Sequence, residues 1–434
     1  MKHVAVRLAV SVLLAAAGAQ AAAPAAGKIT IGVRGRVNAA PSISAMGRVV
    51  VLAWGASTSG GMDVYASVSR DGARTFGVPV RVNDVDGDAS VGGEQPPHVA
   101  LIPRTDREPS IVVVWTAKRT GGTRILAARS DDAGASFSHA RPLAGGEASG
   151  NRGWEAVATD ADGRVVSVWL DHRELAGSAA GQAPMHHEGH DHASAGKAPA
   201  DGASRAQLSK LFFSRLDDAA GGSEAAGRAI AGGVCYCCKT ALAAGADGSI
   251  FAAWRHVYPG NIRDIAFTVS RDGGRSFSEP IRVSDDQWVL DGCPENGPAM
   301  ALDGRQRVHV VWPTLVSGTA ADVEPTLELF YAASSDGRQF SPRRRLPTEG
   351  VPKHAQVAAA HDGSLIVVWE EQARGTRRVV AGRTHGGEAF TRQIVSGAGS
   401  AVYPVVAAAG DSTVVAWTHE VKERSVIQVT RLEN

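Results

Sequence analysis

The segment Ile250-Phe-Ala-Ala-Trp254 is one of seven short apolar runs in this chain that each end in a tryptophan. The other six runs are Val49–Trp54, Ile111–Trp115, Val165–Trp169, Val308–Trp312, Leu365–Trp369 and Thr413–Trp417. Runs of this length, rich in β-branched residues and bounded by Gly and Asp, are typical of buried strands. Because the unit recurs along the whole chain, it predicts a repeat architecture.

Each run belongs to a larger repeating unit. A shorter apolar strand precedes it, and turns such as Asp247-Gly248 join the two, which is a hairpin signal. A third strand follows each tryptophan, as in Ile265–Val269, and a fourth often follows, as in Ile281–Val283. Four strands in a repeat of about fifty residues are typical of a propeller blade. The predicted fold class is therefore all-β, a seven-bladed β-propeller of four-stranded antiparallel blades.

The last repeat has three clear strands before the chain reaches Asn434. The segment Lys28–Val37 precedes the first blade and resembles a fourth strand. We expect it to complete the last blade, because a ring closed in this way has no free sheet edge. The sequence thus predicts one propeller domain over residues 28–434.

A second motif recurs between the third and fourth strands. It is complete in Ser270-Arg-Asp-Gly-Gly-Arg-Ser-Phe277, and it recurs with small changes at Ser69–Phe76, Ser130–Phe137, Ser334–Phe340 and Thr384–Phe390. These segments resemble the Asp boxes (BNR repeats) of the sialidase-like propeller superfamily. The carboxylate can accept turn N–H groups and the Phe can pack between sheets. The resemblance implies that the motifs are structural and lie away from the active face.

Composition and the N-terminus bear on partners and location. Lys plus Arg number 45 and Asp plus Glu 44, so no basic excess indicates a nucleic-acid partner.

Residues 1–21 are typical of a signal peptide: a basic start, the apolar run Leu8–Ala17 and the small-residue cleavage site Ala19-Gln-Ala21. That run is too short to span a bilayer, no cysteine follows it for a lipid anchor, and no later segment looks transmembrane. We expect a periplasmic or secreted protein, where disulfides persist.

The resemblance raises the alternative of an exo-sialidase or a related glycoside hydrolase. Sialidases of this superfamily bind the substrate carboxylate with three arginines and use a Tyr–Glu nucleophile pair with an Asp acid/base. The residues that this implies here are Tyr403, Glu155, Arg152, Arg173 and Arg255. The chain departs from the family where the first arginine is expected, because Ala39 stands two residues before Pro41. An alanine cannot make a bidentate contact with a carboxylate.

The four cysteines are the other chemical feature. Three lie in Cys235-Tyr-Cys-Cys238 and the fourth is Cys293. In the superfamily, loops that begin the first strand of each blade share one face near the axis, which places these two segments side by side at blades four and five. Since export favours oxidation, we expect Cys237 or Cys238 to bridge Cys293 and the other to bridge Cys235.

The rival interpretation is a metal site. Thiolates, imidazoles and a thioether suit copper or zinc. A Gly/Ala/Ser-rich insertion, at about 175–208, follows the third tryptophan run and would lie over the same face. It carries the candidate ligands Met185, His186, His187, His190 and His192, which read either as a metal-recruiting arm or as a solvated loop. A mixed case has one disulfide, with the remaining thiols and His256 or His172 forming a redox-sensitive site.

Three functions follow from these observations. The leading hypothesis is an exported, non-hydrolytic binding protein with a Cys/His site for copper or zinc, or for a small ligand, on the axial face. The second is the glycoside hydrolase described above. The third is a propeller with structural disulfides that binds a periplasmic protein.

Overall fold

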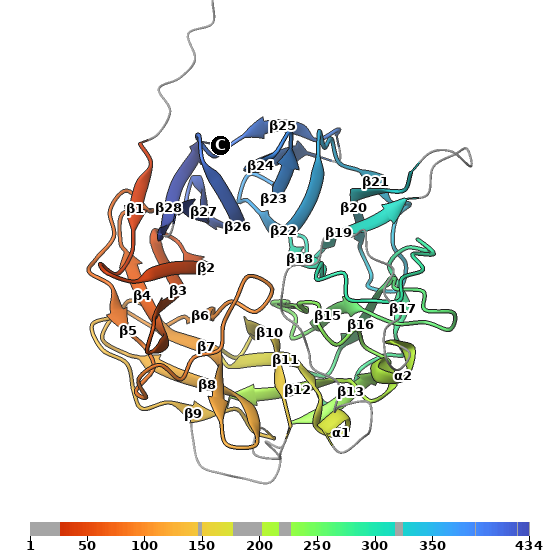
Figure 1. Ribbon diagram of the computed structural model, residues 1–434, viewed down its shortest axis with the longest axis horizontal. Helices are drawn as coiled ribbons and strands as arrows, with labels where there is room; N and C mark the ends of the chain where they lie inside the picture. The colour runs from red at the N-terminus through yellow and green to blue at the C-terminus, as the bar shows by residue number, and fades with distance from the viewer. Residues whose placement is uncertain are drawn as a thin grey trace, which may run out of the picture.

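A computed structural model describes residues 27–145, 150–176, 202–216, 227–316, 324–386, 388–422 and 424–433. These residues form seven four-stranded antiparallel sheets arranged as blades around a ring, as Figure 1 shows. The first strand of each blade contacts the first strands of the two neighbouring blades, so these strands surround the axis. The predicted seven-bladed β-propeller is confirmed.

The blades follow one another along the chain. Blades one to four consist of β2 (Val37–Met46), β3 (Val49–Thr58), β4 (Gly61–Ser69) and β5 (Val80–Arg81); β6 (His98–Ile102), β7 (Ser110–Arg119), β8 (Gly122–Ser130) and β9 (Arg141–Pro142); β10 (Arg152–Thr159), β11 (Val165–Asp171), β12 (Lys210–Leu216) and β13 (Arg228–Gly232); and β14 (Ala241–Ala244), β15 (Ile250–Arg255), β16 (Ile265–Ser270) and β17 (Ile281–Arg282).

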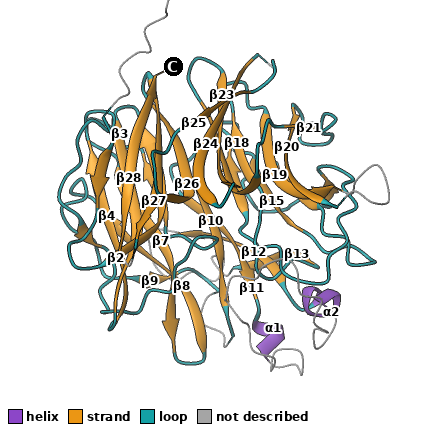
Figure 2. Ribbon diagram, turned by 45° about the horizontal axis from the view of Figure 1, so that its top comes forward, coloured by secondary structure: helices purple, strands orange, loops and turns teal. Residues whose placement is uncertain are grey.

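The remaining blades repeat this pattern. Blades five to seven consist of β18 (Ala299–Leu302), β19 (Val308–Val316), β20 (Thr326–Ser334) and β21 (Arg344–Arg345); β22 (Val351–Ala359), β23 (Ser364–Ala373), β24 (Thr376–His385) and β25 (Thr391–Ile394); and β26 (Ser400–Ala409), β27 (Ser412–Val421), β28 (Arg424–Glu433) and β1 (Ile29–Ile31). Two short helices, α1 (Arg173–Ala176) and α2 (Gly202–Gln207), lie beside blade three (Figures 1 and 2).

The N-terminal strand closes the ring, as the sequence predicts. β1 pairs with β28 in antiparallel register, with Ile29 opposite Val429 and Ile31 opposite Ile427. The closing strand is shorter than the predicted Lys28–Val37, because the chain turns after Ile31 and Val37 already begins β2. Blade seven therefore contains both the beginning and the end of the described chain.

The seven tryptophans of the repeated runs are at most 1% exposed. Each lies in the second strand of its blade, and Trp312 of blade five shares a hydrophobic cluster with Phe251 and Phe267 of blade four. Large aromatic side chains in such positions bury much apolar area between two sheets. The tryptophans thus fill the space between blades, which the repeat pattern predicts.

The Asp-containing turns hold the third and fourth strands of a blade together. In blade two, Asp132 accepts hydrogen bonds from Ser130 Oγ (2.7 Å), Ser136 N (3.0 Å) and Ser136 Oγ (2.5 Å). The bonds from Ser136 lower the pKa of Asp132 to about 2. In blade four, Phe277 of the same motif packs edge-on against Phe213 of blade three, with ring centroids 5.1 Å apart. The Asp bonds therefore fix the turn within a blade, and the Phe of the motif packs it against the neighbouring blade.

Candidate functional site

The cysteine segment Gly233–Thr240 connects β13 of blade three to β14 of blade four. The segment is held at both ends: the Cys235 backbone N–H donates to Arg255 O (2.8 Å), and the Thr240 hydroxyl donates to Trp154 O (2.8 Å). The three cysteines of the segment are at most 7% exposed. The connection between the two blades therefore places three sulfur atoms in the hydrophobic core, away from water.

One of the two predicted disulfides is present. Cys237 is bonded to Cys293, which lies just before β18, so the bridge joins the segments that begin blades four and five. Cys235 and Cys238 are free thiols whose sulfurs lie 3.6 Å apart, a contact distance rather than the roughly 2 Å of a bond. The predicted bridge to Cys293 is confirmed, and the predicted bridge to Cys235 is not formed.

The free thiols remain close to the disulfide. Cys235 Sγ lies 3.8 Å from Cys237 Sγ, and the sulfurs of Cys235, Cys237 and Cys238 all lie within 4.8 Å of one another. Since Cys237 is engaged in the disulfide, two thiols are free to bind a ligand. The site is thus a buried dithiol of the form Cys-x-x-Cys, with a disulfide at its side.

Two arginines give the dithiol a positive environment. Arg263 Nη1 donates to Cys235 Sγ (3.1 Å), while its Nε donates to the carbonyl of Leu290 (2.7 Å). The hydrogen bond from Cys238 lowers the pKa of Cys235, and the charges of Arg263 and Arg255 act in the same direction against burial. Burial raises the pKa of Cys238. The pair therefore favours one thiolate, on Cys235, that a neighbouring thiol and a guanidinium stabilise.

The two histidines predicted near the cysteines are engaged with other groups, although His256 lies beside the cysteine segment, where it forms a β-bridge with Val234. His172 is 2% exposed, its ring lies 5.4 Å from that of Trp154, and burial lowers its pKa to about 4. His256 accepts a hydrogen bond from Trp254 Nε1 at 3.4 Å, and burial lowers its pKa to about 4 as well. Within the described part of the chain, neither histidine is grouped with the three sulfurs.

The predicted ligands of the insertion fall outside the described residues. They are Met185, His186, His187, His190 and His192, and they stay sequence predictions. The predicted signal peptide, residues 1–21, also falls outside that range.

A second polar cluster lies where blades six and seven meet, with residues from β22, β23, β24 and β26. Glu370 Oε1 accepts a hydrogen bond from Arg377 Nε (2.7 Å), and Glu370 Oε2 lies 2.9 Å from His354 Nδ1. Burial alone would raise the pKa of Glu370, but these two partners lower it to about 2. The ring of Tyr403 lies 4.4 Å from that of His354. Blades six and seven thus bring an ionised carboxylate, an imidazole and a phenol together.

Sequence reasoning missed two residues of these clusters, Arg263 and Glu94. Arg263 lies in the connection after β15, and Glu94 lies in the connection between β5 and β6. Glu94 Oε2 accepts backbone hydrogen bonds from Lys239 (3.1 Å) and Gly297 (3.2 Å), so it reaches blades four and five. A signal existed for Glu94, because its connection leads into the first strand of a blade, as the cysteine segment does.

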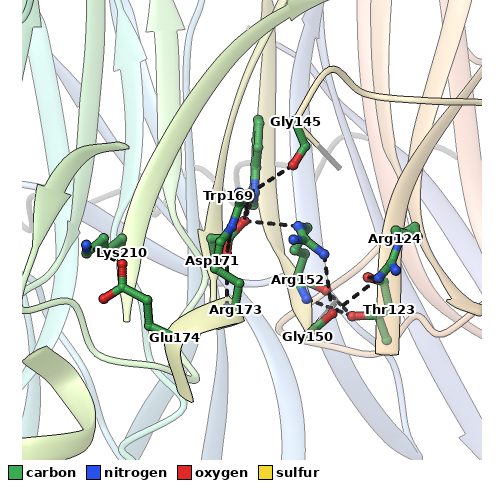
Figure 3. A network of polar contacts seen from close by, with 10 residues as sticks. All are labelled: Thr123, Arg124, Gly145, Gly150, Arg152, Trp169, Asp171, Arg173, Glu174 and Lys210. Atoms are coloured by element: carbon green, nitrogen blue, oxygen red, sulfur yellow. Dashed lines mark hydrogen bonds and ion pairs between the residues drawn. The ribbon is translucent and has the colours of Figure 1, made fainter. Parts of the chain in front are cut away.

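The arginines implied by the sialidase resemblance form a network among themselves (Figure 3). Asp171 Oδ2 accepts hydrogen bonds from Arg152 Nε (3.0 Å) and Arg173 Nη2 (2.7 Å), and its Oδ1 accepts one from Arg173 Nε (2.8 Å). Arg152 and Asp171 are each 1% exposed. Two of the three predicted arginines are therefore held by a buried carboxylate of the protein.

The third arginine and the predicted Glu are engaged as well. Arg255 donates to three backbone carbonyl oxygens, those of Asn296, Arg263 and Pro313, at 2.6–3.0 Å. Glu155 accepts a hydrogen bond from Thr116 Oγ1 (2.9 Å), and burial raises its pKa to about 7. Tyr403, in β26, lies against His354 and not in this group. The five residues therefore come from blades three, four and seven, and Asp171 joins two of them, Arg152 and Arg173.

Among comparisons with known proteins, only those with solved structures find a match, and they agree with the propeller fold. No protein-family model and no curated protein matches the chain. An α-L-arabinanase from Penicillium chrysogenum aligns at a TM-score of 0.52 with 12% identity, covering 94% of this chain and 98% of that one. An α-L-arabinofuranosidase from Fusarium graminearum aligns at 0.51 with 10% identity, covering 94% and 97%. An ulvan lyase of polysaccharide lyase family PL25 aligns at 0.54 with 10% identity, covering 93% and 96%.

These likenesses concern architecture alone, because identities of this size carry no information about side chains. The three proteins are named as enzymes that act on glycans, and this chain shares their propeller fold. No helix in the described ranges is both long and apolar enough to cross a membrane.

Proposed function

We propose that this chain is an exported binding protein whose buried dithiol, Cys235 and Cys238, binds one Cu(I) ion. The observation that carries the proposal is the pair of free sulfurs 3.6 Å apart, in the hydrophobic core and beside a guanidinium. Thiolates are soft ligands, and a soft monovalent cation such as Cu(I) is well served by two of them. The predicted signal peptide and the disulfide support export, since disulfides persist in oxidising compartments.

The charge of the site favours Cu(I). Two thiolates and one Cu(I) carry a net charge of about −1, and a buried anion needs a neighbouring cation. Arg263 donates to Cys235 Sγ and Arg255 lies close enough to affect its pKa, so the pocket supplies that cation. A closed site for Zn(II) takes about four ligands in a tetrahedron. The only other sulfur within 4.8 Å of both thiols among the described residues is that of Cys237, and it is in the disulfide with Cys293, so it cannot serve as a third ligand.

The remaining sequence-predicted ligands have supporting roles in this proposal. His172 is buried and His256 is half-buried, and burial lowers the pKa of both to about 4, so we propose that they surround the site without binding the metal. Met185, His186, His187, His190 and His192 are proposed to deliver the metal.

A metal titration tests the proposal. Protein purified without a tag from the periplasm, and titrated with Cu(I) against a chromophoric chelator under reducing-agent-free, anaerobic conditions, should bind one equivalent. Cys235→Ser and Cys238→Ser should each lower the affinity by at least about 100-fold, because one thiolate remains of two. Arg263→Met should lower it by about 10-fold or more, since a hydrogen bond to a charged group is worth about 1.5–3 kcal/mol.

A matched variant separates the dithiol from the bridge. Cys237→Ser combined with Cys293→Ser removes the disulfide and leaves both proposed ligands, so it should retain the one equivalent. Deletion of residues 183–195 should slow loading without changing stoichiometry. Unchanged Cu(I) binding in Cys235→Ser and Cys238→Ser would contradict the proposal, as would a native protein in which these two thiols are already joined.

The alternative function is action on a glycan, which the names of the three structural neighbours favour. In this case Tyr403, beside His354 and Glu370, is the residue to test. A fluorogenic sialoside and an arabinoside are the substrates to assay with the wild type and Tyr403→Phe. Turnover by the wild type that disappears in Tyr403→Phe supports the enzyme, and no turnover of either substrate argues against these two activities.

A further inference from the structure

The turn Gly92–Gln95 reaches from the β5–β6 connection to the axis of the ring, where Figure 1 shows this connection extending over the middle. The turn is closed by two backbone hydrogen bonds, Gly92 N to Gln95 O (2.9 Å) and Gln95 N to Gly92 O (3.1 Å). Gly93 packs directly against the ring of Tyr403: a Cβ atom built on Gly93 would lie only 1.8 Å from Tyr403 Cε1. On the other side, a Cβ added to Gly153 would be 2.7 Å from Gln95 Oε1. The turn therefore touches blades three and seven.

The carboxylate of Glu94, at the tip of this turn, is bound as a ligand would be. Its Oε2 accepts two backbone N–H groups, from Lys239 at 3.1 Å and Gly297 at 3.2 Å, which come from the starts of two different blades. Converging backbone N–H groups form anion-binding concavities in proteins. Its Oε1 is buried without a hydrogen-bond partner among the described residues and lies 3.9 Å from His354 Nε2. The two backbone N–H groups thus satisfy one oxygen of the Glu94 carboxylate, and its other oxygen is buried without a hydrogen bond to any described residue.

The charges around this position favour an anion. Lys239 is 7% exposed and its ammonium donates to Ala355 O at 2.6 Å, and Glu94 is the carboxylate whose charge acts on it. The nearby cation Arg377 is already paired with Glu370. Without the charge of Glu94, a buried ammonium would remain beside two free backbone N–H groups, and buried charges need a partner.

We propose that the N–H groups of Lys239 and Gly297, together with His354 Nε2, form a carboxylate-binding site that Glu94 fills as a tethered internal ligand. The external ligand is a sugar acid whose carboxylate takes the place of the Glu94 carboxylate. Withdrawal of the turn also uncovers the ring of Tyr403, which Gly93 covers, and an aromatic face is a suitable platform for a sugar ring. Gly92 and Gly93 give the turn the backbone freedom to move. This site adjoins the dithiol, because Lys239 directly follows Cys238 in the chain, but glucuronate binding as proposed does not require a metal.

A binding experiment with D-glucuronate tests this inference, with D-glucose at equal ionic strength as the neutral comparison. Glu94→Ala removes the tethered competitor, whose effective concentration is on the order of mM or more. The variant should bind glucuronate at least about 10-fold more tightly than the wild type, measured by isothermal titration calorimetry. It should not bind glucose measurably, because glucose lacks the carboxylate.

Two further variants complete the design. Glu94→Gln keeps the length of the side chain but loses the charge, so its affinity for glucuronate should fall between those of the wild type and Glu94→Ala. It also serves if Glu94→Ala does not fold. Glu279→Ala removes an exposed carboxylate in the connection between β16 and β17, away from the turn and from Tyr403, and should bind like the wild type. Equal glucuronate affinities in the wild type and Glu94→Gln, or equal binding of glucose and glucuronate by Glu94→Ala, would overturn the proposal.

Discussion

Glu155 should make the protein less stable as the pH rises, and its replacement should remove that effect. Its side chain lies in β10, is 1% exposed, and has one oxygen bonded to Thr116 Oγ1 at 2.9 Å while the other has no partner among the described residues. Burial raises its pKa from the ordinary 4.5 to about 7. One pKa unit corresponds to about 1.4 kcal/mol, so ionised Glu155 costs the folded state about 3 kcal/mol.

The direction of the pH effect follows from proton binding. Between pH 4.5 and about 7 the folded protein keeps a proton on Glu155 that the unfolded chain has lost, so stability falls as the pH rises through this window. Glu155→Gln keeps an oxygen for Thr116 and never ionises. It should therefore stabilise the protein by less than about 1 kcal/mol at pH 5 and by about 3 kcal/mol at pH 8. Urea unfolding at both pH values, followed by tryptophan fluorescence, measures the difference.

Two results would refute this reasoning. One is a stabilisation by Glu155→Gln that is the same at pH 5 and pH 8, and the other is a destabilisation at pH 8. Glu295→Gln, at an exposed carboxylate, controls for the loss of one negative charge and should show neither effect.

Three further predictions concern stability and are all measured by urea unfolding. Asp171→Asn should cost about 3–5 kcal/mol, because the buried Arg152 loses its carboxylate partner; a loss below 1 kcal/mol would show that the pair is dispensable. Reduction of the Cys237–Cys293 bridge, which spans 56 positions, should cost about 4 kcal/mol through the entropy of the unfolded chain. An equal response to reductant in a variant with serine at both positions would mean that the effect has another source. Trp312→Ala should cost about 3–5 kcal/mol, because it opens a cavity between blades four and five; an effect near that of a surface substitution would disprove the packing role.

The repeat pattern in the sequence predicts the fold nearly completely. Seven runs that end in tryptophan specify seven second strands, and the Asp-containing turns specify where the third strand gives way to the fourth. Such features are predictable because each blade must bury the same face against its neighbour, so the same residue types recur at the same places. The contact between the two cysteine segments follows from the same repetition, since both segments precede the first strand of a blade.

The chemistry of the sites depends on residues outside the repeat, which the sequence does not place. Arg263 and Glu94 lie in irregular connections whose paths no periodicity describes, yet one contacts Cys235 and the other contacts Lys239. Arg152 and Arg173 both lie in or beside blade three, and nothing in the sequence shows that Asp171 engages both. Side-chain pairing of this kind depends on differences of a few tenths of an ångström in atom positions. The repeat pattern fixes only which strand a residue occupies.

The pairing of β1 with β28 has a consequence for the order in which the protein folds. A ribosome makes Ile427–Val429 almost 400 residues after their partners, Ile29–Ile31. At a synthesis rate of about 5–20 residues per second, the first strand waits for tens of seconds before a partner exists. Blades one to six can assemble during that wait, because each is complete in itself. The ring, however, becomes a closed object only after Ile427–Val429 have been made and have paired with Ile29–Ile31.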